Sequence, residues 1–122
     1  MNESSKWTLH IVAGVLILIL LGMHMITMHM QTALEWIGLG TEQVTSFESV
    51  AKRGQQVSYM VIYIALLGAA LYHGLYGLRN IALELLPGRG VQKAVGGVLT
   101  VVGLALFALG TYAAIAAFRM EV

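Results

Sequence analysis

Three long apolar stretches constrain this chain more than any other feature. In the first of them, no residue from position 11 to position 23 has a polar side chain. About 20 apolar residues cross the hydrocarbon core of a bilayer as a helix. Two further apolar stretches follow, each long enough to cross once. The sequence therefore predicts three membrane-spanning helices, at about 7–30, 55–86 and 91–118.

The composition agrees with a membrane protein. Of the 122 residues, 58% are hydrophobic and 11% are charged, which is too apolar for a soluble domain of this size. A net charge of +1 gives no reason to expect nucleic acid as a partner. Without cysteine, the chain has no disulfide, iron–sulfur ligand or thiolate ligand for haem. We predict an all-α integral membrane protein, a single domain of residues 1–122 in contact with membrane lipid.

The connecting segments predict the order and direction of the helices. Residues 31–56 are polar, and within them Thr45–Glu48 has a capping-box pattern that predicts a short helix at the membrane surface. The segment Pro87–Gly90 is a sharp stop, so the second and third spans are expected to be antiparallel neighbours. Three spans place the termini on opposite sides. Lysine and arginine are slightly more numerous on the N-terminal side, which predicts a cytoplasmic N-terminus.

All four histidines fall within the predicted spans, and His24 and His73 lie deeper in them than His10 and His29. A histidine inside a membrane is costly and faces a partner, a cavity or a cofactor. His24 is late in the first span and His73 is late in the second, so they are expected in opposite halves of the membrane. This separation suits two cofactors rather than one shared metal. His29 lies roughly 140° around the helix from His24 and cannot face the same cofactor. Hydrogen bonding between helices is the alternative role for these histidines.

Small residues surround the two histidines. Gly74 and Gly77 leave space beside His73, which favours a flat ligand, although glycines also allow helices to pack closely. For the glycines of the third span, which has no histidine, we expect packing. Arg79 lies about 9 Å beyond His73 along the helix. It is expected either to extend to the membrane surface or to pair with an anionic group.

The segment around His73 resembles a known family. His73-x3-Gly77-x-Arg79, followed by Glu84, is similar to the H-x3-G-x-R…D/E signature of the membrane-anchor (cytochrome b) subunits of succinate dehydrogenases and fumarate reductases. Aspartate is commoner in the family at the position of Glu84. In that family the histidine of this motif is an axial ligand of haem b.

The first span resembles the same family. Leu9-His10-x3-Gly14 is similar to the opening of the family's first helix, where a histidine or arginine approaches a haem propionate. In the family an arginine often stands next to this histidine, and this chain lacks it. His24 followed by His29 resembles the first helix of members with two haems and two anchor chains.

The resemblance implies a haem-binding bundle formed with a second anchor chain. It implies two b haems, with His73 as an axial ligand of the haem nearer the iron–sulfur subunit and His24 as a ligand of the distal haem. Arg79 and His10 are implied near propionates, with His29 as the second histidine of the distal part. The second ligand of each haem is expected from the partner, because we expect no further histidine of this chain at the same depth.

The implied function is that of a non-catalytic subunit of succinate:quinone oxidoreductase in the cell inner or cytoplasmic membrane. An iron–sulfur subunit and a flavoprotein subunit would act on succinate or fumarate, and this chain would pass electrons to or from membrane quinone. Quinone reduction consumes protons, for which Glu42, Glu48 and Glu84 are candidate donors. Two alternatives stay open. One is a haem-free structural anchor, and the other is a small transporter subunit, which normally needs a carboxylate inside a span.

Overall fold

The computed structural model describes residues 2–39 and 46–120, and these residues form helices and no strand. The helices are α1 (Glu3–Trp36), α2 (Phe47–Gly54), α3 (Val57–Leu85) and α4 (Arg89–Phe118). Three of them, α1, α3 and α4, are long and apolar enough to cross a membrane. The prediction of an all-α chain with three membrane-spanning helices is confirmed to this extent.

Helix α1 extends beyond the predicted span at both ends because both ends are capped. At the start, the Asn2 side chain accepts a hydrogen bond from the Ser5 backbone N–H at 2.8 Å. At the end, Gly38 adopts a left-handed backbone with a φ of 77°. Its N–H donates to the Glu35 carbonyl at 3.0 Å, and the next N–H, of Leu39, donates to an earlier carbonyl at 2.8 Å. This pair of bonds is a Schellman motif, which satisfies the last carbonyl groups of the helix.

The short helix α2 lies in the polar connection. Its N-cap is Ser46, whose side chain accepts a hydrogen bond from the Ser49 backbone N–H at 3.3 Å. The cap is therefore one residue later than the capping-box pattern suggested, and Thr45 lies outside the described residues. Ser49 takes the position that the pattern assigned to Glu48, because the Ser46 hydroxyl also bonds the Ser49 hydroxyl, at 3.0 Å.

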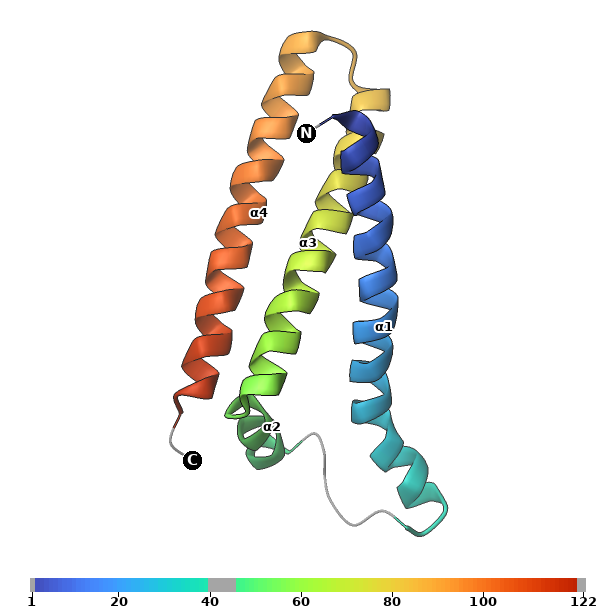
Figure 1. The fold of residues 1–122 in the computed structure, drawn as a ribbon, viewed down its shortest axis with the longest axis vertical. Coiled ribbons are helices and arrows are strands. Elements are labelled where there is room, and N and C mark those ends of the chain that lie inside the picture. The colour runs from blue at the N-terminus through green and yellow to red at the C-terminus, as the bar shows by residue number, and fades with distance from the viewer. Residues whose placement is uncertain (1, 40–45, 121–122) are drawn as a thin grey trace.

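The three long helices lie in a row with α3 in the middle (Figure 1). Helix α3 packs against both α1 and α4, whereas α1 and α4 do not touch each other. The N-terminus lies near the α3–α4 turn and the C-terminus lies near α2, so the termini are at opposite ends (Figure 1). This agrees with three antiparallel crossings.

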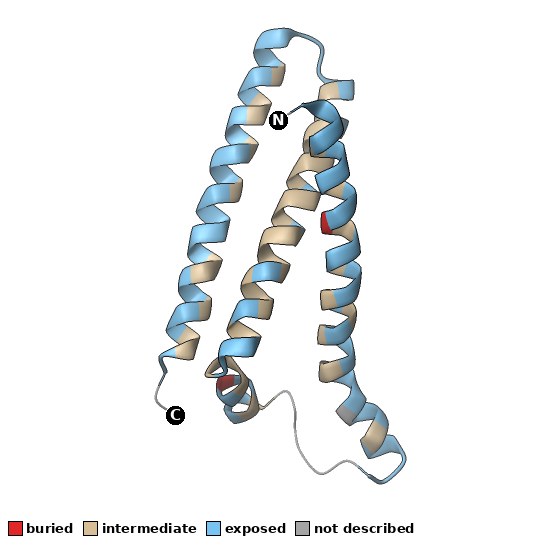
Figure 2. Ribbon diagram, in the orientation of Figure 1, coloured by how far each residue is buried: buried red, intermediate tan, exposed pale blue. Residues whose placement is uncertain are grey.

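Very few residues of this row of helices are buried within the chain. Among the described residues, only Ala13 and Ala51 are buried, and the rest of the ribbon is coloured exposed or intermediate (Figure 2). Large apolar side chains are among the exposed ones, such as Leu18 at 75% exposure. A water-soluble monomer rarely exposes so much contiguous apolar surface. The outer faces of α1, α3 and α4 therefore require lipid or another protein chain as a neighbour.

The α3–α4 contact is built on glycines that recur every seven residues on α4. A Cβ atom at Gly103 would lie 2.6 Å from Leu75 Cδ1, and one at Gly110 would collide with Leu67. These glycines therefore admit leucine side chains of α3, as expected for packing. At the turn that joins the helices, Gly88 has a φ of 114°, a conformation that side chains other than glycine rarely adopt.

Candidate functional site

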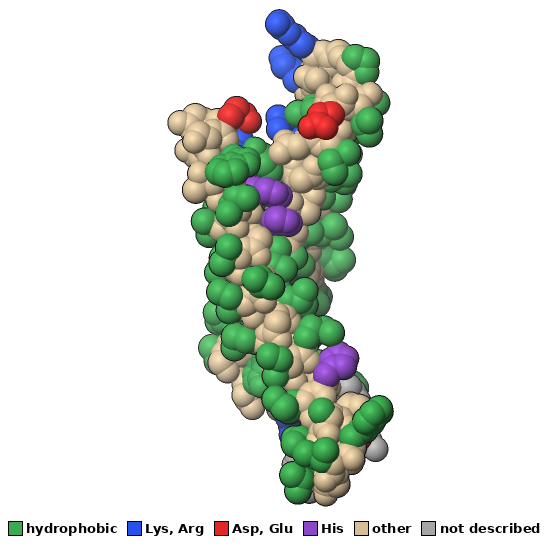
Figure 3. Space-filling model, turned by 90° about the vertical axis from the view of Figure 1, so that its right-hand side faces the viewer, with side chains coloured by type: hydrophobic (Ala, Val, Ile, Leu, Met, Phe, Trp, Pro, Cys, Tyr) green, Lys and Arg blue, Asp and Glu red, His purple; other side chains and the backbone are tan. Residues whose placement is uncertain are grey.

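The structure brings His73 of α3 together with His10 of α1. Their imidazole rings stack with centroids 4.0 Å apart and planes 6° from parallel. The expectation that no other histidine of the chain lies at the depth of His73 is therefore wrong. The error arose because residue spacing gives depth within one helix, whereas the offset of α1 against α3 is set by their packing. Histidine side chains appear at two separate levels of the molecule (Figure 3).

Two glycines make this stack possible, and the arrangement is reciprocal. A Cβ atom at Gly14 would lie 3.0 Å from Cε1 of His73, and a Cβ atom at Gly77 would lie 3.6 Å from Cε1 of His10. In each helix the glycine follows the histidine by four residues, which places both on one helix face. Each His-x3-Gly segment thus packs its ring on the glycine of the other. Gly77, predicted to leave space for a ligand, instead accommodates His10.

A hydrogen bond sets the protonation of the His73 ring. Its Nδ1 atom lies 3.0 Å from the backbone carbonyl oxygen of His10. A carbonyl oxygen only accepts, so Nδ1 carries the hydrogen and donates it. In the neutral ring the lone pair is then on Nε2, and the hydrogen bond of this ring within the described residues is made through Nδ1. A histidine that binds a metal typically donates its other N–H in this way.

The His10 ring is in a different state. Its Nδ1 atom is buried and has no hydrogen-bond partner among the described residues. Its other neighbour is Tyr76, with ring centroids 5.1 Å apart. Tyr72, one turn earlier, donates its hydroxyl to the Lys6 carbonyl at 3.1 Å and so also joins α3 to α1. Neither tyrosine was recognised from the sequence, although their four-residue spacing places both on one face of α3.

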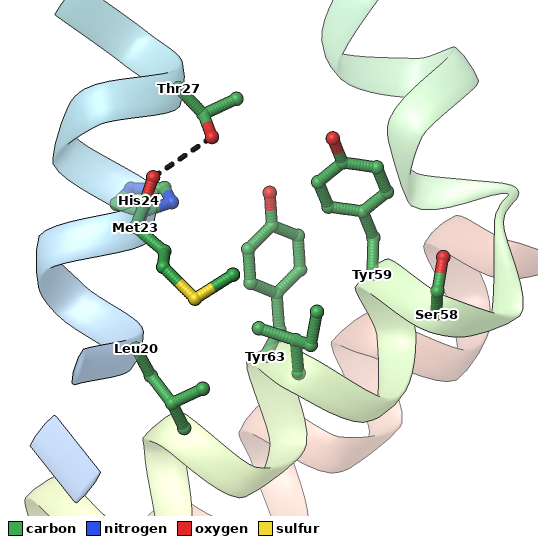
Figure 4. A pocket seen from close by; sticks show the side chains of 8 residues that line it. Leu20, Met23, His24, Thr27, Ser58, Tyr59 and Tyr63 are labelled. Atoms are coloured by element: carbon green, nitrogen blue, oxygen red, sulfur yellow. Dashed lines mark hydrogen bonds between the residues drawn. The ribbon is translucent and has the colours of Figure 1, made fainter.

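His24 lies at the other end of the α1–α3 contact, beside a pocket of about 270 Å³. Figure 4 shows its ring next to Tyr63, with Tyr59 farther along the same wall. The rings of His24 and Tyr63 meet edge to face at 5.8 Å. The remaining lining comes from both helices: Leu20, Met23, Thr27, Ser58 and Ile62. Tyr59 and Tyr63 were not recognised from the sequence, where only their four-residue spacing marks them.

His29 is exposed and bonds within its own helix. Its Nδ1 atom donates to the Met25 carbonyl at 2.9 Å, so its Nε2 also carries the lone pair in the neutral ring. His29 does not line the pocket beside His24. The two histidines therefore do not share one site, as their spacing predicted.

Arg79 lies on a different side of α3 from His73. Its Nε atom is 3.7 Å from the position that a Cβ of Gly96 in α4 would occupy, whereas His73 faces α1. A role for Arg79 at a propionate near His73 stays a prediction. The same holds for His10, whose ring is part of the stack.

The two candidate proton donors within the described residues, Glu48 and Glu84, lie on different helices, α2 and α3. Glu48 forms an exposed ion pair with Lys52 at 2.8 Å. The hydrogen bond from Lys52 and its charge lower the pKa of the Glu48 carboxyl below its ordinary value. Glu84 is exposed near the end of α3, and Glu42 lies outside the described residues.

The residues present fit one axial position of a haem at each level. His73 has an imidazole nitrogen with a free lone pair, and a Cβ atom added at the adjacent Gly74 would meet nothing within 4 Å. At the other level, His24 lines a pocket of about 270 Å³. His10 cannot be the second ligand at the His73 level. Two axial imidazoles point nitrogens at each other across the iron, whereas the stacked rings present their faces.

Comparisons of the chain with protein-family models, with curated proteins and with solved structures gave no match. The family suggested by the segment around His73 therefore stays a prediction.

Proposed function

We propose that this chain is a haem b-binding membrane-anchor subunit of succinate:quinone oxidoreductase, which passes electrons between an iron–sulfur subunit and membrane quinone. The observation that carries the proposal is the 3.0 Å hydrogen bond from His73 Nδ1 to the His10 carbonyl. It holds the ring in one orientation and leaves Nε2 as the electron-pair donor. When bound, haem b would supply one-electron transfer.

The roles of the chain's own residues follow from this geometry. His73 would bind the haem nearer the iron–sulfur subunit, oriented by the backbone of α1. His24 would bind the distal haem, with Tyr63 against the edge of its ring. The pocket beside His24, at about 270 Å³, is below the range of about 300–1,000 Å³ usual for ligand sites. A second anchor chain would therefore supply the rest of each site and the other axial ligand.

One observation favours a second candidate function, a haem-free structural anchor. The reciprocal contacts of His10 with Gly77 and of His73 with Gly14 give both histidines a packing role without any cofactor. Interhelical contacts of polar side chains are common in membrane bundles. A mutation at His73 must therefore be judged on haem content and on assembly separately.

The test is a pyridine haemochrome measurement on the purified native complex, expressed per copy of this chain. We expect two b haems for the wild type and one for His73→Ala or His24→Ala, with the soluble subunits still bound. Tyr112→Phe, at an exposed position near the end of α4, is the control and should retain both haems. His73→Met should keep the haem and raise its reduction potential, because a thioether ligand favours the reduced iron.

Each other result has a definite meaning. No haem in the wild-type complex would leave the structural anchor as the function. If His29→Ala loses the distal haem while His24→Ala keeps both haems, the ligand of the distal haem is His29 and not His24. Full haem content in His73→Ala would overturn the assignment of the proximal ligand.

A further inference from the structure

A groove between α3 and α4 joins a cationic pocket to an apolar one. The cationic pocket, about 270 Å³, is lined by Arg79, Arg89 and Lys93 together with Leu83, Gln92 and Gly96. The apolar pocket, about 300 Å³, also includes Arg79 and Gly96 and continues along the helices. Its apolar lining comes chiefly from Leu75, Leu99 and Leu104. The two pockets therefore form one groove with Arg79 at the junction.

The charged side chains that line the cationic pocket are all positive. No acidic residue lines it, and none of the ion pairs within residues 2–39 and 46–120 includes Arg79, Arg89 or Lys93. Glu84 of α3 lies about 140° around the helix from Arg79. The half-buried Arg79 lies against α4 at Gly96, where an added Cβ atom would be 3.7 Å from its Nε atom. Glu3 of α1 is near enough to Arg79 for their charges to interact, but its carboxylate pairs with Lys6 at 2.6 Å. Arg79, Arg89 and Lys93 thus line the pocket with no acidic side chain among them.

The groove runs from the α3–α4 turn toward the middle of the two helices. Its cationic end is next to the α3–α4 turn, where lysine and arginine side chains gather (Figure 3). Its apolar end runs toward the middle of two spans that are long and apolar enough to cross a bilayer. A ligand that matches both ends has an anionic head and a hydrocarbon tail.

We propose that this groove binds an anionic phospholipid. Its phosphate lies between Arg79, Arg89 and Lys93, and one acyl chain lies along the apolar pocket. Basic pockets between membrane helices bind anionic headgroups for the same electrostatic reason. An acidic protein surface would match the cations but would leave the adjoining apolar pocket unfilled. The proposal does not depend on haem or on the proposed function.

The experiment measures retained lipid on the full chain in nanodiscs of phosphatidylcholine with or without phosphatidylglycerol. Native mass spectrometry after release into detergent counts bound lipids. We expect selective retention of phosphatidylglycerol by the wild type, reduced about fivefold for each cation replaced in Arg79→Gln, Arg89→Gln and Lys93→Gln. Lys52→Gln removes an exposed cation at the opposite end of the chain and is the matched control, with retention unchanged.

Two further measurements complete the experiment. The first tests whether the bound phosphate belongs to a lipid, and the second tests the apolar pocket in a variant whose folding is checked. Inorganic phosphate added in excess should not displace the lipid, because it cannot fill the apolar pocket, and displacement would overturn the assignment to a lipid. Leu99→Trp should lower retention while circular dichroism confirms the helix content. Unchanged retention in all three cation variants overturns the proposal.

Discussion

The rings of His10 and His73 stack 4.0 Å apart, and each ring lies over the glycine that follows the other histidine by four residues. This relationship sets the register of α1 against α3, because a shift of either helix by one residue would bring a histidine ring against a side chain. It also links packing to chemistry. In the same contact, His73 Nδ1 donates its hydrogen to the backbone carbonyl of His10.

Gly14 should be intolerant of any side chain. In Gly14→Ala the new Cβ atom would lie 3.0 Å from Cε1 and 3.2 Å from Nδ1 of His73, whose ring is held by the stack and by a hydrogen bond. We expect a loss of about 1–3 kcal/mol in the free energy of unfolding, measured in mixed detergent micelles by circular dichroism. Gly97→Ala is the control, since a Cβ atom there would meet nothing within 4 Å. Equal losses in both variants would argue against the His73 contact.

Two replacements of His10 should distinguish the contribution of its aromatic ring to stability from that of its Nδ1 atom. His10→Phe keeps a stacked aromatic ring and removes a buried Nδ1 atom without a partner, so its stability should equal or exceed that of the wild type. His10→Ala removes the ring contact and should cost about 0.5–1.5 kcal/mol. The same unfolding measurement compares the two. If phenylalanine is as harmful as alanine, the imidazole nitrogen contributes an interaction of its own.

Gly74 tests the space beside His73. A Cβ atom added there meets nothing within 4 Å in this chain, so Gly74→Leu should leave the unfolding of the isolated chain unchanged. In the native complex it should lower the haem content per copy, because the leucine would occupy the volume next to the ligand. The haemochrome assay reads this directly. Full haem content together with impaired assembly would indicate that a partner helix, and not a cofactor, fills the space.

The cap of α2 should stabilise that helix locally. Ser46→Ala removes the hydroxyl that accepts the Ser49 N–H bond and should cost about 1 kcal/mol. Faster hydrogen exchange of the α2 amides, without change in α3, is the expected result. Ser58→Ala serves as the control, because Ser58 is exposed in the first turn of α3 and is not its N-cap. Exchange that is equally fast in both variants would contradict the role of the cap.

The ion pair of Glu48 with Lys52 should respond to acid. Lys52 lowers the pKa of the Glu48 carboxyl below 4.5, first by its hydrogen bond and then by its charge. The stabilisation of α2 by the pair is therefore present at neutral pH and is lost as the pH falls through the lowered pKa. Lys52→Gln should return the pKa toward 4.5, as followed by carbon NMR of the carboxyl group. A titration curve that does not move would show that Lys52 is not the cause.

Part of this architecture follows from local properties of the chain. Uninterrupted apolar runs predict membrane helices, since a backbone in hydrocarbon must satisfy its own hydrogen bonds. The turn at Gly88 and the short helix after Ser46 have equally local causes, a glycine with positive φ and a side-chain cap. The separation of His24 from His73 along the bundle was also predictable, because helical rise converts residue number into depth.

The neighbouring helix that each functional side chain contacts depends on long-range packing. The spacing of Arg79 from His73 suggested a shared ligand, yet Arg79 lies against Gly96 of α4 and His73 lies against Gly14 of α1. Likewise, nothing local pairs His10 with His73, which are far apart in sequence. Residue spacing along one helix gives angles around its axis, but only the neighbouring helices assign a contact to each angle. The stack and the cationic groove therefore emerge only when α1, α3 and α4 are packed together.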